Sequence, residues 1–175
     1  GNGTQLGENL PRAHIGGLDL DGDGSATDLV VSESGGVYYL PGPFAGGDHW
    51  GAESSLLVEL LGSNGRGADI RDVDSGDVDG DGSVELVVGW SHYASSYSGA
   101  SAGHVSVIEI PGGLESGRID WPITEIQNSV RVADVSGDGI ADVIAGSDSE
   151  DTVHIFESMP VGEIDDSTYD HRIER

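Results

Sequence analysis

The sequence contains no cysteine and no lysine, and it has no apolar run of about 18 residues. Without cysteine, the chain cannot form disulfides or use a thiol nucleophile. Without lysine, it has neither a Schiff-base amine nor the lysine of a nucleotide-binding P-loop. Because there is no long apolar run, we expect no membrane insertion. The N-terminus shows no signal-peptide pattern.

Positive charge is scarce as well. All seven basic residues are arginine, against 32 aspartates and glutamates, and the formal net charge is -25. A chain this acidic is not expected to bind nucleic acid or an anionic membrane surface. At 175 residues, the chain has the length of one domain with a sizeable core.

Three acidic loops interrupted by glycine are the main feature that is present. They begin at Asp19, Asp77 and Asp134, so they are spaced by 58 and 57 residues. The second loop reads DVDGDGSVE from Asp77 to Glu85, with oxygen-bearing side chains at positions 1, 3, 5 and 9. Carboxylates that converge from a short loop, with glycine at the sharp turns, suit a hard divalent cation. The nearly equal spacing predicts an internal repeat.

Each repeat also contains strand-like segments. A β-branched run follows each loop, and second, third and fourth short runs lead to the next loop. Glu53–Leu61 is the one helical candidate, and its leucines suit a strand equally well. We predict an all-β fold of β-propeller blades, each of four antiparallel strands, with about three blades in a single segment, 1–175. The approximate repeats are 5–62, 63–122 and 123–175. The predicted strands include Leu29–Val31, Gly36–Leu40, Ser55–Leu61, Ala68–Val73, Leu86–Val88, His104–Ile110, Ile119–Ile126, Ser129–Ala133, Val143–Gly146 and Thr152–Phe156.

Other interpretations of the loops compete with a metal site of this kind. An EF-hand requires glutamate at position 12, where this chain has Val30, Val88 and Ala145, so we exclude it. A calcium-binding β-roll requires tandem nine-residue repeats, which we do not find. Asx turns, in which aspartate serves turn geometry only, remain the alternative. Three evenly spaced copies favour metal binding.

Nothing in the sequence indicates catalysis. The segment between Gly89 and Gly103 is rich in serine and tyrosine, which predicts a flexible hairpin connection or, alternatively, a contact surface. Its Gly-x-Ser-x-Gly match, which ends at Gly103, lacks the strand-to-helix context of a nucleophile elbow. The six histidines show no close metal-binding spacing. We therefore expect that the chain is not an enzyme.

The third loop reads DVSGDGIADVIAG from Asp134 to Gly146 and resembles the FG-GAP repeat, which builds the seven-bladed propeller of integrin α subunits. The segment from Asp77 to Gly89 is nearly as similar. The first copy departs from the pattern, because Asp28 lies one residue late and Thr27 occupies position 9. The family's Phe-Gly pair is poorly kept. The resemblance covers roughly residues 5–160.

The resemblance implies that calcium (Ca2+) binds each loop through side chains at positions 1, 3, 5 and 9 and the backbone carbonyl at position 7. It also implies that each loop joins the first and second strands of a blade. The implied ligands are Asp19, Asp21, Asp23, Ser25 and Asp28 in the first loop, Asp77, Asp79, Asp81, Ser83 and Glu85 in the second, and Asp134, Ser136, Asp138, Ile140 and Asp142 in the third.

Three blades are too few to close a propeller, which typically has about four to eight. We expect further blades from a longer chain, or else from self-association. The expected function is a calcium-stabilised extracellular module, secreted or on the cell surface, for binding or adhesion to a protein or glycan. The alternatives are a structural subunit of an extracellular filament or coat, and an accessory domain of a secreted enzyme.

Overall fold

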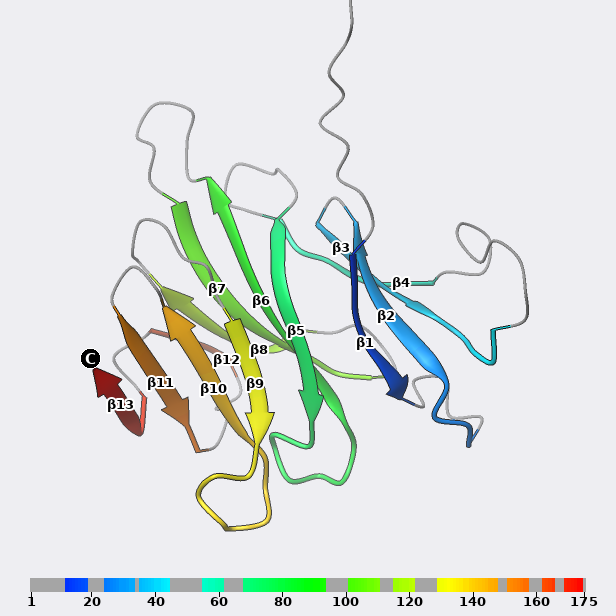
Figure 1. Ribbon diagram of the computed structural model, residues 1–175. Coiled ribbons are helices and arrows are strands. Elements are labelled where there is room, and N and C mark those ends of the chain that lie inside the picture. Colours follow the sequence, from blue (N-terminus) through cyan, green and yellow to red (C-terminus); the bar gives the residue numbers. More distant parts are fainter. Residues whose placement is uncertain are drawn as a thin grey trace, which may run out of the picture.

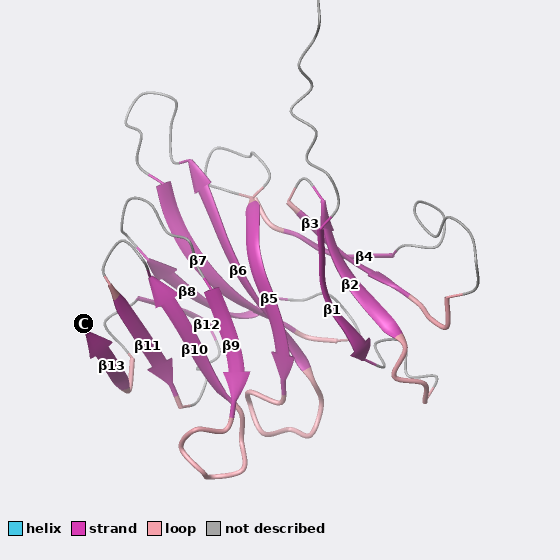
Figure 2. Cartoon of the chain, viewed as in Figure 1, coloured by secondary structure: helices cyan, strands magenta, loops and turns pink. Residues whose placement is uncertain are grey.

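The computed structural model describes residues 12–18, 24–33, 35–44, 55–61, 68–93, 101–110, 115–121, 129–147, 151–157, 162–165 and 169–174. These residues form strands and loops and contain no helix, as Figure 2 shows. None of them therefore belongs to a helix that could cross a membrane. The all-β prediction is confirmed.

The strands form three small sheets (Figure 1). In the first and third sheets every neighbouring pair is antiparallel, and in the second sheet one pair is parallel. The first sheet has the order β1 (Arg12–Leu18), β2 (Asp28–Glu33), β3 (Gly36–Leu40) and β4 (Ser55–Glu59). The second has the order β5 (Asp69–Gly76), β6 (Glu85–Tyr93), β7 (Ser101–Ile108), β8 (Glu115–Trp121) and β12 (Gly162–Asp165). The third has the order β9 (Ser129–Ala133), β10 (Asp142–Ser147), β11 (Thr152–Phe156) and β13 (His171–Glu174).

The sheets lie next to one another along their first strands. β1, β5 and β9 run in the same direction in Figure 1, and β5 contacts both of the others. Strands alternate their side chains between two faces, so each sheet can contact a neighbour on either side. Figure 1 shows three blade-like sheets in a row but no closed ring.

Two apolar clusters fill the spaces between the sheets. The first joins the first and second sheets through residues such as Val30, Leu86 and Trp90. The second joins the second and third sheets through residues such as Val87 and Val143. Leu86 and Val87 are neighbours in β6 and belong to different clusters, because successive side chains of a strand point to opposite faces. The middle sheet is therefore covered by apolar side chains on both faces.

Several predicted strands match the structure and others need correction. β3, β9 and β11 have the predicted bounds. The predicted strand Ile119–Ile126 overlaps β8 as far as Trp121. The rest of that prediction lies outside the described residues. Glu53–Leu61 contains β4 rather than a helix.

The connection predicted between Gly89 and Gly103 is shorter than expected. β6 continues to Tyr93 and β7 begins at Ser101, so both ends of the segment are strand. The reason is burial: Trp90 is fully buried in the apolar cluster, and its indole N–H donates a 2.9 Å hydrogen bond to Ser106 Oγ. Residues 94–100 lie outside the described part of the chain.

Candidate metal centre

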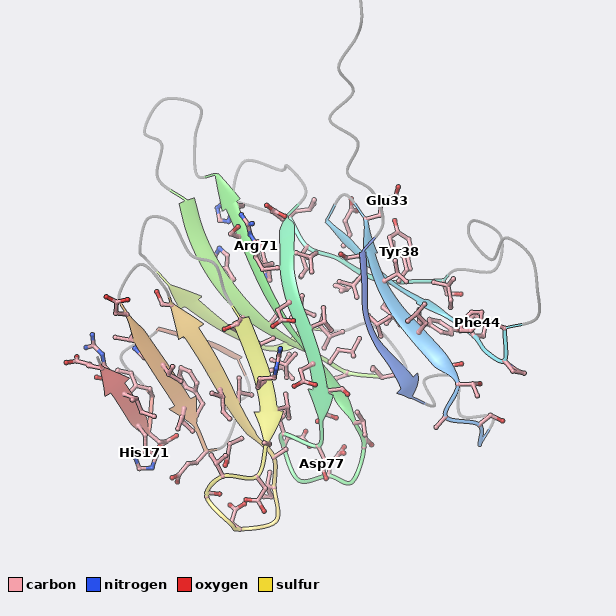
Figure 3. All side chains as sticks on the ribbon, viewed as in Figure 1. Glu33, Tyr38, Phe44, Arg71, Asp77 and His171 are labelled. Atoms are coloured by element: carbon pink, nitrogen blue, oxygen red, sulfur yellow. The ribbon has the colours of Figure 1, made fainter. Side chains whose placement is uncertain are left out.

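The second acidic loop joins β5 to β6 at the lower edge of the molecule, where Figure 3 labels Asp77. Gly80 and Gly82 have φ angles of 78° and 91°, in the left-handed region that glycine adopts without a Cβ clash. These turns direct the two glycine amides to the carboxylate oxygens of Asp77, at 2.7 and 3.0 Å. Asp79 and Asp81 each accept a hydrogen bond from the amide two residues later. The backbone thus fixes the orientation of three carboxylates.

Three acidic side chains of this loop converge. Ligand atoms of Asp77, Asp79 and Glu85 all lie within 4.8 Å of one another. Glu85 is fully buried; its Oε2 accepts a 3.0 Å hydrogen bond from the Val78 amide, while its Oε1 has no hydrogen-bond partner. Burying a polar atom without a partner costs free energy unless another group satisfies it. A metal ion held by the three carboxylates would do so.

The environment of Glu85 changes its acidity. Burial of the carboxyl group raises the pKa of Glu85 from 4.5 to about 7, because the charged form loses its hydration. The Val78 amide acts in the opposite direction, and the negative charges of Asp79, Glu109 and Asp81 add to the increase. A cation beside Glu85 would favour the charged form instead.

The third loop repeats this local geometry between β9 and β10. Asp134 accepts hydrogen bonds from the amides of Gly137 and Gly139 at 2.6 and 3.0 Å, as Asp77 does in the second loop. Asp138 accepts one from the Ile140 amide. Asp142 is fully buried and accepts two amide bonds on Oδ2, while its Oδ1 has no hydrogen-bond partner.

The two loops differ at position 3, where the third loop has Ser136 in place of Asp79. Among the described residues, the second-loop trio is the one group of three acidic or histidine side chains close enough to hold a metal ion. The third loop brings its ligand candidates into the same backbone arrangement but supplies fewer carboxylates. The remaining predicted ligands of these two loops, Asp81, Ser83 and Asp138, are exposed, and Ile140 is half-buried.

The first loop is described only from Gly24 onward. The predicted ligands Asp19, Asp21 and Asp23 lie outside the described residues. The carbonyl oxygen of Ser25 accepts a 2.7 Å hydrogen bond from the Thr27 amide. Asp28 is buried, and its Oδ1 accepts a 2.8 Å bond from the Gly42 amide.

Strand register resolves the one-residue displacement of Asp28. Leu18, which precedes the first loop, pairs with Asp28. Gly76 pairs with Glu85 and Ala133 with Asp142 in the same way. All three acidic residues are buried and open the second strand of their sheet. The first loop is therefore one residue longer, and Asp28 takes the place of Glu85 and Asp142.

The candidate ligand atoms favour a hard cation. The candidate ligands are carboxylate, hydroxyl and carbonyl oxygens, which suit calcium, magnesium or manganese better than zinc or copper. Asx turns explain the hydrogen bonds from Gly80 and Gly137 without any metal. They do not explain why Glu85 Oε1 and Asp142 Oδ1 are buried without a donor. These two oxygens distinguish a metal loop from a turn built for geometry alone.

The structure also brings together two histidines, which the sequence spacing did not predict. His92 Nδ1 and His104 Nε2 lie 2.9 Å apart in the buried end of the second sheet. The two imidazole rings stack on each other, and His104 also stacks on Trp90. Antiparallel pairing of β6 with β7 places them together across 12 residues of sequence. No third acidic or histidine ligand joins them among the described residues.

Sequence reasoning missed the acidic residues that join the second and third sheets. Asp72 and Asp74 of β5 accept hydrogen bonds from the amides of Val130 and Val132 in β9, at 3.2 and 2.9 Å. Arg131 adds a 2.7 Å ion pair with Asp72. Asp72 lies in the predicted strand Ala68–Val73 and Asp74 directly follows it, and this alternation of acidic residues was the available signal. The chain matches no protein-family model, no curated protein and no solved structure. The geometry of the second and third acidic loops is therefore the evidence for a metal centre.

Proposed function

We propose that the chain is a calcium-stabilised β-propeller segment of the FG-GAP kind, which serves as an extracellular binding or adhesion module. One observation carries the proposal: the three carboxylates of Asp77, Asp79 and Glu85 converge within 4.8 Å, and one buried oxygen of Glu85 lacks a hydrogen-bond partner. The repeated loop, the three blade-like sheets and the sequence resemblance support it.

Calcium fits these loops better than magnesium. Calcium accepts about six to eight oxygen ligands in flexible geometry, whereas magnesium requires near-ideal octahedral geometry and usually keeps several waters. A loop that offers several side-chain oxygens and a carbonyl within nine positions resembles the calcium case. The exposure of the second and third loops is consistent with exchange of the ion with solvent. Extracellular calcium modules bind with dissociation constants of roughly 0.1 to 1 mM.

The role of the ion is structural in this proposal. The acidic loops join the first and second strands of each sheet, so they hold neighbouring strand ends in place. Calcium would offset the repulsion between their carboxylates and thereby stabilise the strands beside them. The rigid sheets then present connecting loops to a protein or glycan ligand, because binding residues concentrate on loops supported by a rigid scaffold.

Thermal unfolding with calcium and with a chelator tests the proposal. We expect calcium to raise the melting temperature of the chain, and excess chelator to reverse the increase. Binding of ligand at one hundred times its dissociation constant stabilises a protein by about 2.7 kcal/mol per site, which is readily measured. Magnesium at the same concentration should have a smaller effect. No shift with calcium would refute the structural role of the metal.

A second candidate function, a structural subunit of an extracellular filament or coat, is favoured by one observation. The third sheet presents a partly uncovered face that includes Ile144, Val153 and Ile155, all half-buried, and the exposed Val135 nearby. Apolar surface of this kind favours association between chains. Sedimentation over a range of protein and calcium concentrations separates the candidates, because a subunit of an assembly should associate.

A further inference from the structure

The second and third acidic loops contact each other directly. The Ala141 amide, in the third loop, donates a 2.9 Å hydrogen bond to the Asp77 carbonyl, at the start of the second. The side chain of Ile140 lies over Gly80, since a Cβ placed on Gly80 would be 2.9 Å from Ile140 Cδ1. Gly76, just before the second loop, would bring a Cβ within 3.2 Å of Ala141. Two residues of the third loop therefore support the second.

Both sides of this contact belong to candidate metal loops. Ile140 holds position 7 of the third loop, the position whose carbonyl the repeat pattern assigns to the metal, and Ala141 precedes Asp142. Asp77 holds position 1 of the second loop and belongs to the converging trio. Val78 follows it and is fully buried in the apolar cluster shared with the third sheet. An ion that orders either loop thus orders one half of the contact.

We propose that the two loops bind their metal ions with positive cooperativity, and that Ile140 and Ala141 are positioning residues for the metal site of the second loop. This inference rests on the proposed calcium function. Metal in the third loop fixes these two residues, so the second loop loses less conformational freedom when it binds. By linkage, metal in the second loop favours binding in the third by the same factor.

Electrostatics acts in the opposite direction. An ion in one loop reduces the negative potential that attracts an ion to the other. Salt weakens this opposing effect at exposed sites, because the Debye length falls to about 8 Å at physiological ionic strength. The contact between the loops is short-range and should not weaken in the same way. The cooperativity should therefore increase when salt is added.

The test is a calcium titration followed by NMR, with the amides of Gly80 and Gly82 reporting the second loop and those of Gly137 and Gly139 the third. The affinity of each loop is measured in the unaltered chain and in chains whose other loop is disabled, by D77N/D79N or by D134N/D138N. We expect each loop to bind at least about five-fold more weakly when the other is disabled, and by matching factors. Circular dichroism of each variant checks that it folds.

Ile140→Ala then tests the positioning role, because it removes the contact with Gly80 and keeps the Ile140 carbonyl. We expect the coupling factor to fall toward one in this variant. Val135→Ala is the matched control, since Val135 lies in the same loop but is 53 % exposed. A variant that only loosens the fold would lower the calcium affinity of a loop by the same factor whether the other loop is intact or disabled. The coupling factor would then not change.

The outcomes separate the two proposals. If neither set of glycine amides responds to calcium, the calcium function fails and the cooperativity fails with it. If both respond and each loop binds equally well with the other disabled, the calcium function stands and the cooperativity is overturned. A coupling factor that survives Ile140→Ala overturns the role of this side chain.

Discussion

Glu85 combines several properties that are expected of a metal ligand. It is fully buried, has one oxygen without a hydrogen-bond partner and lies with Asp77 and Asp79. Burial raises the pKa of its carboxyl group from 4.5 to about 7. A pKa difference of this size corresponds to roughly 3 kcal/mol between the two protonation states. Without metal, the charged form of Glu85 destabilises the fold.

Glu85→Gln should therefore have opposite effects with and without calcium. In chelator, the variant should be as stable as the unaltered chain or more so near pH 8, because an uncharged amide replaces a buried charge. With calcium, its increase in melting temperature should be much smaller, because a charged ligand is lost. Differential scanning calorimetry measures both. Glu174→Gln, on the exposed β13, is the control and should change neither value.

The pH dependence follows from the same pKa. Because the folded-state pKa of Glu85 lies above its unfolded value, the folded protein holds the extra proton between about pH 4.5 and 7. The stabilisation from Glu85 is therefore complete below about pH 4.5 and is lost as the pH rises through 7. Urea unfolding in chelator, at about pH 5 and about pH 8, should show a larger loss for the unaltered chain than for Glu85→Gln. An equal loss in both would contradict the assigned pKa.

Calcium binding should show the reverse trend. A metal ligand must be deprotonated, so calcium affinity should fall as the pH drops below about 7 and Glu85 takes up its proton. Calorimetric titrations in two buffers of different ionisation enthalpy should detect proton release on binding near pH 6. Near pH 8.5, where Glu85 is already ionised, this release should be absent.

At the scale of elements, the close approach of β5 to the third sheet explains the glycine at position 76. A Cβ there would lie 2.5 Å from Val132 Cγ1 and 3.2 Å from the Cβ of Ala141. The equivalent residue of the third sheet is Ala133, which pairs with Asp142 as Gly76 pairs with Glu85 and is exposed. Glycine is needed where the next sheet packs, and alanine is accepted where no described sheet does.

Gly76→Ala should therefore destabilise the chain by about 1–3 kcal/mol, the usual cost of overpacking a well-filled site. Ala133→Gly, the reciprocal change, should cost no more than about 1 kcal/mol, since only backbone entropy and a small side chain are involved. Chemical denaturation of both variants measures the difference. Equal costs would mean that the approach of the two sheets is looser than the structure shows.

The sequence was sufficient for the repeated elements and insufficient for the contacts between them. Alternating apolar residues and turn residues located β3, β9 and β11, and the acidic pattern located the trio that includes Glu85. These signals are local. The Asp72 and Asp74 bonds to β9 join residues that are 58 positions apart, close to the repeat spacing. The spacing marks near-equivalent positions of two repeats, but it does not show that the neighbouring sheets pack there or that these side chains bond across them.

At the scale of the whole molecule, equivalent residues differ according to whether a sheet covers them. Val78 and Val135 both follow the first aspartate of their loops, yet Val78 is 0 % exposed and Val135 is 53 % exposed. Val87 is fully buried, whereas its counterpart Ile144 is half-buried. The third sheet covers Val78 and Val87, and no described sheet covers the others.

Val78→Ala should cost about 1–3 kcal/mol of stability, because it removes two methyl groups from a filled core. Val135→Ala should change the stability of this chain by less than about 0.5 kcal/mol, the usual range for exposed sites. Urea denaturation of the pair tests this. A large cost for Val135→Ala would show that its side chain is already covered.

The parallel strand β12 has a consequence for synthesis of the chain. Gly162 pairs with Gly117 of β8, and β12 belongs to the second sheet although it follows β11 of the third. While the chain emerges from the ribosome, the outer edge of β8 therefore stays open until residues 162–165 have been made. An open edge is a template for pairing with other chains. β12 is the last strand to join the second sheet; it pairs with the edge of β8 and becomes the outer strand itself.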